Sequence, residues 1–311
     1  MFEQETIDLY KKLVKEAAET DIGWRHSPVE DWKIDYFAKN FNENNLINFR
    51  RTPLVEGVIS FPDRPLRKGV RLTQPWLSGL PLWQKIRGIR DILVELYPLN
   101  SYFKINLSEV GDSPVGNPCY YSFGNIKITD LAIRMCFYRK YIEKEFKHAS
   151  NILEIGGGFG GLCLKLMQSK ILNPQKYFFT DLPENLALAF YYLKNNNFNV
   201  KVFERGQDIE RDSGKVVYIV APWKLKDLNV RMDLFINTMS FQHMTRENIV
   251  YYLSEINRLN TKNLFLVNRD GKRDATDLKI SEYPIPEKYI LSKEEKYLFS
   301  NHLMRKYSLI N

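Results

Sequence analysis

The sequence predicts an α/β protein whose C-terminal part is a doubly wound, mostly parallel sheet. Short apolar runs typical of buried strands alternate with segments of helical periodicity from residue 151 onward. The run at 152–155 breaks into a glycine-rich turn and enters a predicted helix at 162–168, and the run at 177–179 ends on Asp181. Strand, glycine turn, helix, strand and acid in this order are typical of a nucleotide-binding βαβ unit.

The rest of the C-terminal part continues the alternation. Further strands are predicted at 200–203, 216–220, 234–236 and 264–267, with helices at 183–195 and 245–259. The tail from Lys279 has room for the antiparallel hairpin that closes such sheets, with 303–309 as the last strand. Ligands of such sheets bind at the carboxyl ends of the strands, so the residues that follow each strand are the candidate site residues.

The part of the chain before the glycine turn is predicted to be mainly helical, with irregular connections. Apolar residues recur at helical spacing in 1–19 and in 82–97. The aromatic-rich stretch 21–49 fits either a plain core or a platform for sugar rings. The proline-rich stretch 52–81 carries four cations, which either reach an anionic substrate or face solvent.

A boundary between two regions is predicted just before the first strand of the sheet. Thr129 and Asp130 can cap a helix that runs to about His148 and delivers the chain to that strand. We therefore predict a mainly helical accessory region at 1–128 and a cofactor domain at 129–311.

The glycine-rich turn by itself fits two kinds of ligand. Its glycines let the backbone turn sharply and let a ligand approach the main chain, where a Cβ would intrude. The spacing Gly156-x-Gly158-x-x-Gly161 fits a dinucleotide fingerprint, whereas Glu154-x-Gly156-x-Gly158-x-Gly160 fits the acid-then-glycine pattern of S-adenosylmethionine sites. The acid two residues before the first glycine favours the methyl donor.

Three segments resemble a known family. LEIGGGFGG, at 153–161, resembles the first motif of class I S-adenosylmethionine-dependent methyltransferases. TDLPENL, at 180–186, resembles the second-strand motif of many small-molecule O-methyltransferases, and DLFINTMSFQHM, at 233–244, looks like the fourth strand and its loop. Together they resemble the sugar O-methyltransferase family of bacterial polysaccharide clusters, over roughly the C-terminal half of the chain.

The resemblance implies a fold, a cofactor and a reaction. The fold would be a Rossmann-like class I methyltransferase sheet with an antiparallel last strand, and the accessory region would cover the substrate. The cofactor would be S-adenosyl-L-methionine. The reaction would move its methyl group to a sugar hydroxyl, on a nucleotide-sugar or a surface-glycan precursor, by in-line displacement with a general base.

It also implies roles for single residues. Asp181 would accept two ribose hydroxyl protons, and Gln207 or Asp208, after the strand at 200–203, would bind the adenine amine unless they only form the turn. His243 is the candidate base, since an unperturbed histidine has a pKa of about 6.5; it could also be only a polar residue that caps the helix starting near Thr245. The other predicted cofactor contacts are Glu154, Gly156, Gly157, Gly158, Gly160, Leu182 and Asn237. The predicted substrate contacts are Tyr120, Tyr121, Gln242 and Arg269.

Composition narrows the class of protein. The chain has 311 residues, 44% of them hydrophobic and 14% aromatic, which is enough for a substantial core. No apolar run is long enough to cross a bilayer and the start lacks the apolar centre of a signal peptide, so a cytoplasmic location is expected. The three cysteines have no metal spacing and are expected to be reduced. The acids Asp270, Asp274 and Asp277 do not match a calcium cage, and no metal is expected.

The net charge of +8 leaves the partners open. Lysines and arginines are spread along the chain, which indicates a generally basic surface, and no nucleic-acid partner is expected. Peripheral association with a lipid-linked glycan and a homodimer are both compatible with the sequence. The alternatives are an O-methyltransferase acting on a phenolic natural product, an NAD-dependent dehydrogenase, a basic RNA-binding or RNA-modifying protein, and an inactive protein with the same fold.

Overall fold

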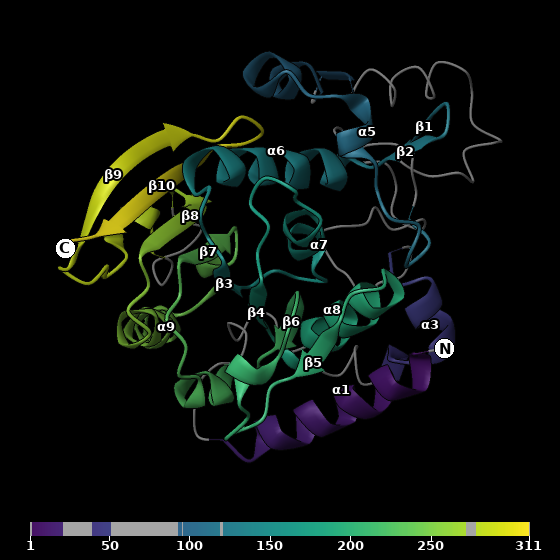
Figure 1. Cartoon of the computed structure of the whole chain (residues 1–311), viewed down its shortest axis with the longest axis vertical. Helices are drawn as coiled ribbons and strands as arrows, with labels where there is room; N and C mark the ends of the chain where they lie inside the picture. The colour runs from purple at the N-terminus through teal and green to yellow at the C-terminus, as the bar shows by residue number, and fades with distance from the viewer. Residues whose placement is uncertain are drawn as a thin grey trace.

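The computed structural model describes residues 2–20, 39–50, 93–94, 96–118, 121–271 and 278–310 (Figure 1). Within them, one sheet has the strand order β5-β6-β4-β3-β7-β8-β10-β9. Its strands are β3 (Asn151–Ile155), β4 (Lys176–Thr180), β5 (Val200–Val202), β6 (Val216–Ile219), β7 (Leu234–Thr238), β8 (Asn263–Arg269), β9 (Tyr289–Lys296) and β10 (His302–Leu309). Strands β3 to β8 pair in parallel, and β10 is antiparallel to both of its neighbours. The predicted Rossmann-like sheet with an antiparallel last strand is therefore confirmed.

The sheet is covered by helices on both faces. Alternate residues of each strand point to opposite faces, and they divide the core in two. Ile152 and Phe179 lie in one hydrophobic cluster, while Leu153 and Phe178 lie in the other. The first cluster contains residues of α6 (Asp130–Glu145), α7 (Gly161–Met167) and α8 (Pro183–Asn195), and the second those of α9 (Arg246–Arg258). Figure 1 shows these two layers on either side of the sheet.

The helices begin where their sequences predict. The Thr129 side chain accepts a hydrogen bond from the Ala132 N–H and caps α6, and Thr245 caps α9 in the same way. Pro183 occupies the first position of α8, where its missing N–H costs nothing.

The segments before the sheet comprise short helices and a hairpin. They are α1 (Glu3–Ala18), α3 (Glu43–Ile47), α5 (Leu107–Val110), a helical stretch at 96–103, and β1 (Tyr121–Phe123) paired with β2 (Ile126–Ile128). Helix α1 lies along α8 (Figure 1), and its predicted apolar face, with Leu9, Leu13 and Ala17, is buried. In its C-terminal half, Glu16 accepts a hydrogen bond from the Trp223 indole (3.2 Å), and Lys12 pairs with Glu204 (2.6 Å). Helix α1 is therefore attached to the segments that follow β5 and β6.

One strand occupies an unexpected position. The strand beside β4 is β6, and β5 lies outside it at the edge. All four residues of β6 are buried, whereas in β5 only Val200 is. The turn that follows β5, which is expected to face the adenine ring, begins at the edge of the sheet. The residues that directly follow β6, the neighbour of β4, are Val220 and Ala221.

Several predicted features lie outside the described residues: Tyr120, the aromatic residues between 21 and 38, the four cations of 52–81, Cys119, Asp274 and Asp277. The cysteines that are described, Cys136 and Cys163, are buried free thiols. Across the described ranges, no helix has the length and apolar character to cross a membrane, and no three His, Cys, Asp or Glu side chains are grouped as for a metal ion.

Candidate functional site

The glycine turn connects β3 to α7 at the carboxyl edge of the sheet. The Gly156 N–H donates to the carbonyl of Thr180 at the end of β4 (2.8 Å). Gly156 has a φ of +77°, and a Cβ built on it would lie 1.8 Å from Oγ of Ser240, in the loop after β7. Glycine is therefore required at this position by the close approach of that loop, and a ligand is not needed to explain it.

Gly158 is different because its surroundings are open. Its φ is +61°, and a Cβ built on it would meet no atom within 4 Å. Its N–H donates to Oδ2 of Asp181 (2.8 Å), so the bare backbone of the turn lies directly beside a carboxylate. This is the one predicted cofactor glycine at which the main chain offers an open surface with a polar group beside it.

Asp181 is fixed by three hydrogen bonds. Oδ2 accepts from Gly158, and Oδ1 accepts from the Leu182 N–H (2.7 Å) and from Nδ2 of Asn185 (2.9 Å). Burial raises the pKa of Asp181 to about 6, although these three hydrogen bonds act against the rise. A carboxylate can accept about four hydrogen bonds, and three are already made. A ribose that donates both of its hydroxyl groups to Asp181 would therefore have to share or replace one of these three partners.

Glu154 lies behind the turn, not beyond it. It is 1% exposed, its Oε2 accepts from the Tyr177 hydroxyl (2.8 Å), and a Cβ on Gly157 would come within 2.6 Å of its carboxyl carbon. Burial, together with the nearby charge of Asp181, raises the pKa of Glu154 to about 8 despite the hydrogen bond from Tyr177. Its other oxygen, Oε1, is buried and has no hydrogen-bond partner among the residues that the structure describes.

A chain of buried amide groups crosses the ends of β3, β7 and β8. Nδ2 of Asn237 donates to the Ile155 carbonyl (2.8 Å), directly before the glycine turn. Oδ1 of Asn237 accepts from the Phe241 N–H (3.1 Å) and from Nδ2 of Asn268 (2.9 Å). Both asparagines are fully buried. Asn237 therefore supports the turn from behind, and Asn268, which the sequence reasoning missed, holds Asn237.

The same chain continues to the predicted base. The Gln242 N–H donates to Oδ1 of Asn268 (3.3 Å), and Oε1 of Gln242 accepts from the Arg269 N–H (3.0 Å). That second bond fixes the orientation of the amide, so Nε2 of Gln242 is the donor in its 3.2 Å contact with Nε2 of His243. His243 thus lies beside Gln242, with its Nε2 lone pair directed at the Gln242 amide.

Of the remaining predicted residues, Leu182 belongs to the site through the hydrogen bond from its N–H to Asp181. Gln207 accepts from the Glu204 N–H (3.3 Å) and Asp208 from the Glu210 N–H (3.2 Å), so both side chains stabilise their own turn. Leu182 is the residue before α8 and is half-buried. Tyr121 lies in β1 of the hairpin. The adenine contact expected of Gln207 or Asp208 stays a prediction.

The chain was compared with known proteins. No family model and no curated protein matches it. Solved structures with similar regions include the mitomycin 7-O-methyltransferase (12% identity, TM-score 0.39, covering 58% of each chain) and the 16S rRNA methylase RmtB (12%, 0.38, 58% of this chain and 65% of that one). A third is the magnesium protoporphyrin IX methyltransferase of Synechocystis PCC 6803 with bound SAH (10%, 0.39, 60% and 90%). At these identities and TM-scores, what those proteins act on says nothing of the substrate of this chain.

Proposed function

We propose that this chain is an S-adenosyl-L-methionine-dependent O-methyltransferase whose acceptor is a sugar hydroxyl. The observation that carries the proposal is the open backbone at Gly158 beside the Asp181 carboxylate, at the carboxyl edge of a doubly wound sheet. Such a surface suits a ribose that lies on the main chain. Glu154, buried behind the same turn, would support the turn from the protein side.

The acceptor class comes from the three motifs, and the chemistry limits what the protein must do. The cofactor would supply an activated methyl group, which leaves its sulfur as the hydroxyl oxygen forms the new bond. The residues of the chain then need to hold the reactants in line, which is worth up to about 7–11 kcal/mol. Gly158 and Asp181 would bind the nucleoside, and Asn237 and Asn268 would keep the turn and the β7 loop in register.

The proton of the acceptor hydroxyl must go to a base, and His243 is the candidate. In the structure its Nε2 lone pair faces the amide of Gln242. To accept a proton at Nε2, the ring has to exchange Gln242 for the hydroxyl. Hydrogen bonds to a catalytic base often form only when the substrate binds, and a base of this kind raises the reaction rate about 10²–10⁴-fold.

Calorimetric titration with S-adenosylmethionine, S-adenosylhomocysteine and NAD tests the proposal. Micromolar binding of the first two, absent for NAD and lost in Gly158→Val, is expected, because a valine side chain would fill the open surface. Binding of NAD alone would favour a dehydrogenase. A folded protein that binds none of the three would contradict the proposal.

A further inference from the structure

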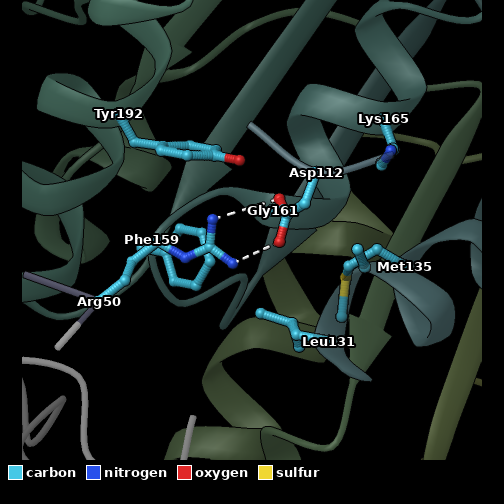
Figure 2. A pocket seen from close by; sticks show the side chains of 9 residues that line it. Arg50, Asp112, Leu131, Met135, Phe159, Gly161, Lys165 and Tyr192 are labelled. Carbon is cyan, nitrogen blue, oxygen red and sulfur yellow. Dashed lines mark hydrogen bonds and ion pairs between the residues drawn. The ribbon is translucent and has the colours of Figure 1, made fainter. Parts of the chain in front are cut away.

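The glycine turn contains one large side chain, Phe159, whose surroundings come from distant parts of the chain. Phe159 follows Gly158 and is buried. Figure 2 shows its ring beside the guanidinium of Arg50, whose central carbon lies 5.1 Å from the ring centroid. Phe49 and Tyr192 meet the same ring edge-on, with centroid distances of 5.4 and 4.9 Å. The ring is therefore enclosed by an aromatic and cationic cage.

Arg50 is held by a bidentate ion pair with Asp112. Nη2 lies 2.6 Å from Oδ2 and Nη1 lies 3.2 Å from Oδ1, and the two side chains are only 4% and 7% exposed. Nη1 also donates to the Ser113 carbonyl (3.1 Å), and Asp112 accepts from Oγ1 of Thr129 (2.5 Å). These bonds fix the plane of the guanidinium and hence its stacking on Phe159.

The charge of the pair is maintained inside the protein. Burial by itself would raise the pKa of Asp112, but the pairing with Arg50 and the hydrogen bond from Thr129 outweigh burial and lower that pKa. Asp112 therefore remains a carboxylate at neutral pH. It is an anchor whose strength does not change across the physiological range.

The segment that carries Asp112 is also attached to α7. Lys165, in the second turn of α7, is buried and donates to the carbonyls of Gly111 and Glu109 (3.4 Å to the latter). The stacking of Arg50 on Phe159 therefore holds the glycine turn, and the hydrogen bonds of Lys165 hold α7, the helix that the turn enters at Gly161. The pocket between these groups measures only about 10 Å³, room for about one water molecule, so it is no second ligand site.

A buried ion pair is a poor way to gain stability, since apolar replacements of both partners are often neutral or stabilising. What the pair does here is hold the Arg50 guanidinium in a fixed position against the Phe159 ring. We propose that Arg50 is a positioning residue for cofactor binding: paired with Asp112, it supports Phe159 and so holds the open surface of Gly158 in its binding geometry. The inference rests on the proposed function, since it assigns a purpose to that surface.

The test uses the double variant Arg50→Met/Asp112→Leu, which removes both charges and keeps apolar bulk. Three quantities are measured: the melting temperature, the affinity for S-adenosylhomocysteine, and the hydrogen exchange of the Gly158 amide without ligand. We expect a melting temperature within a few degrees of wild type, an affinity at least about ten-fold weaker, and an amide that exchanges at least about ten-fold faster. The matched control is Arg139→Met/Glu143→Leu, an ion pair on α6 (2.7 Å) whose side chains are 15% and 3% exposed, which should leave affinity and exchange unchanged.

Phe159→Leu provides the second measurement. It keeps the apolar contact but removes the ring, and should reproduce most of the affinity loss, with no further loss when combined with the double variant. If the double variant does not fold, Phe159→Leu decides by itself.

The outcomes separate the two proposals. If the double variant or Phe159→Leu keeps the affinity and the amide exchange of wild type, the ion pair only attaches the N-terminal segment. That result would refute the positioning role of Arg50 and leave the proposed function standing. A wild-type protein that binds neither S-adenosylmethionine nor S-adenosylhomocysteine would remove the proposed function, and the cofactor role of Arg50 with it.

Discussion

Replacement of Glu154 by glutamine should change how stability depends on pH. Glu154 is buried behind the glycine turn, and burial raises its pKa from an ordinary value of 4.5 to about 8. The folded protein therefore holds this proton more tightly than the unfolded chain does. The stabilisation that results is complete below pH 4.5 and is lost as the pH rises through about 8.

The magnitude follows from the difference between the two pKa values. At about 1.36 kcal/mol for each of roughly 3.5 pH units, the free energy of unfolding should fall by about 5 kcal/mol between pH 4.5 and 8 because of this group. Glutamine has nearly the same shape and does not titrate. Glu154→Gln should lack this part of the pH dependence and gain stability relative to wild type as the pH rises.

Urea denaturation at pH 5, 6, 7 and 8, followed by tryptophan fluorescence, measures the effect for both proteins. Glu210→Gln, a substitution at an exposed carboxylate on the surface, is the control and should follow the wild-type curve. Parallel curves for wild type and Glu154→Gln over this range would refute the reasoning, because they would mean that Glu154 is already ionised in the folded protein.

Two further predictions concern the loop after β7. Gly156→Ala should lose about 2–4 kcal/mol of stability, because alanine is strained in a left-handed conformation and its Cβ would clash with Ser240. Ser240→Gly in the same chain should restore the part of the loss that is due to the clash. Chemical denaturation of the single and double variants measures the losses, and losses that simply add would contradict the clash. Because Gln242 donates to Nε2 of His243, the neutral ring should carry its proton on Nδ1, and loss of a bond worth about 1 kcal/mol in Gln242→Leu should shift the tautomer ratio about five-fold toward Nε2–H. Nitrogen-15 NMR of the ring distinguishes the two tautomers, and an unchanged ratio would show that Gln242 does not orient His243.

Local pattern was sufficient for the sheet but not for the spatial order of its strands. Apolar runs, helix caps and the glycine turn are encoded within a few residues, and the strand bounds at Asn151–Ile155 and His302–Leu309 agree with the sequence. β6 lies between β4 and β5, and all of its residues are buried, whereas β5 lies at the edge of the sheet and is partly exposed. That is a property of the assembled sheet, although the unbroken apolar run Val216–Ile219 hinted at it.

The supporting contacts of the candidate site were not predictable in this way, because they join distant residues. Asn268 looks like a polar end to an apolar strand, and its partner Asn237 is 31 residues away. Arg50 and Asp112 are 62 residues apart, and neither lies in a recognisable motif. Sequence patterns identified the glycine turn and Asp181, whereas the buried groups that hold them, such as Asn268, can be recognised only when the chain is folded.

The packing of α1 has a consequence for the synthesis of the protein. Lys12 pairs with Glu204 and Glu16 with Lys224, contacts that span 192 and 208 residues. At about 5–20 residues per second, α1 leaves the ribosome about 10–40 s before its partners exist. During that time its apolar face, with Leu9 and Leu13, lacks the cover that α8 provides, although Phe41, which stacks on Tyr10 (4.1 Å between ring centroids), is made much earlier. Helix α1 therefore completes its packing only after α8 and the turns that follow β5 and β6 have been made.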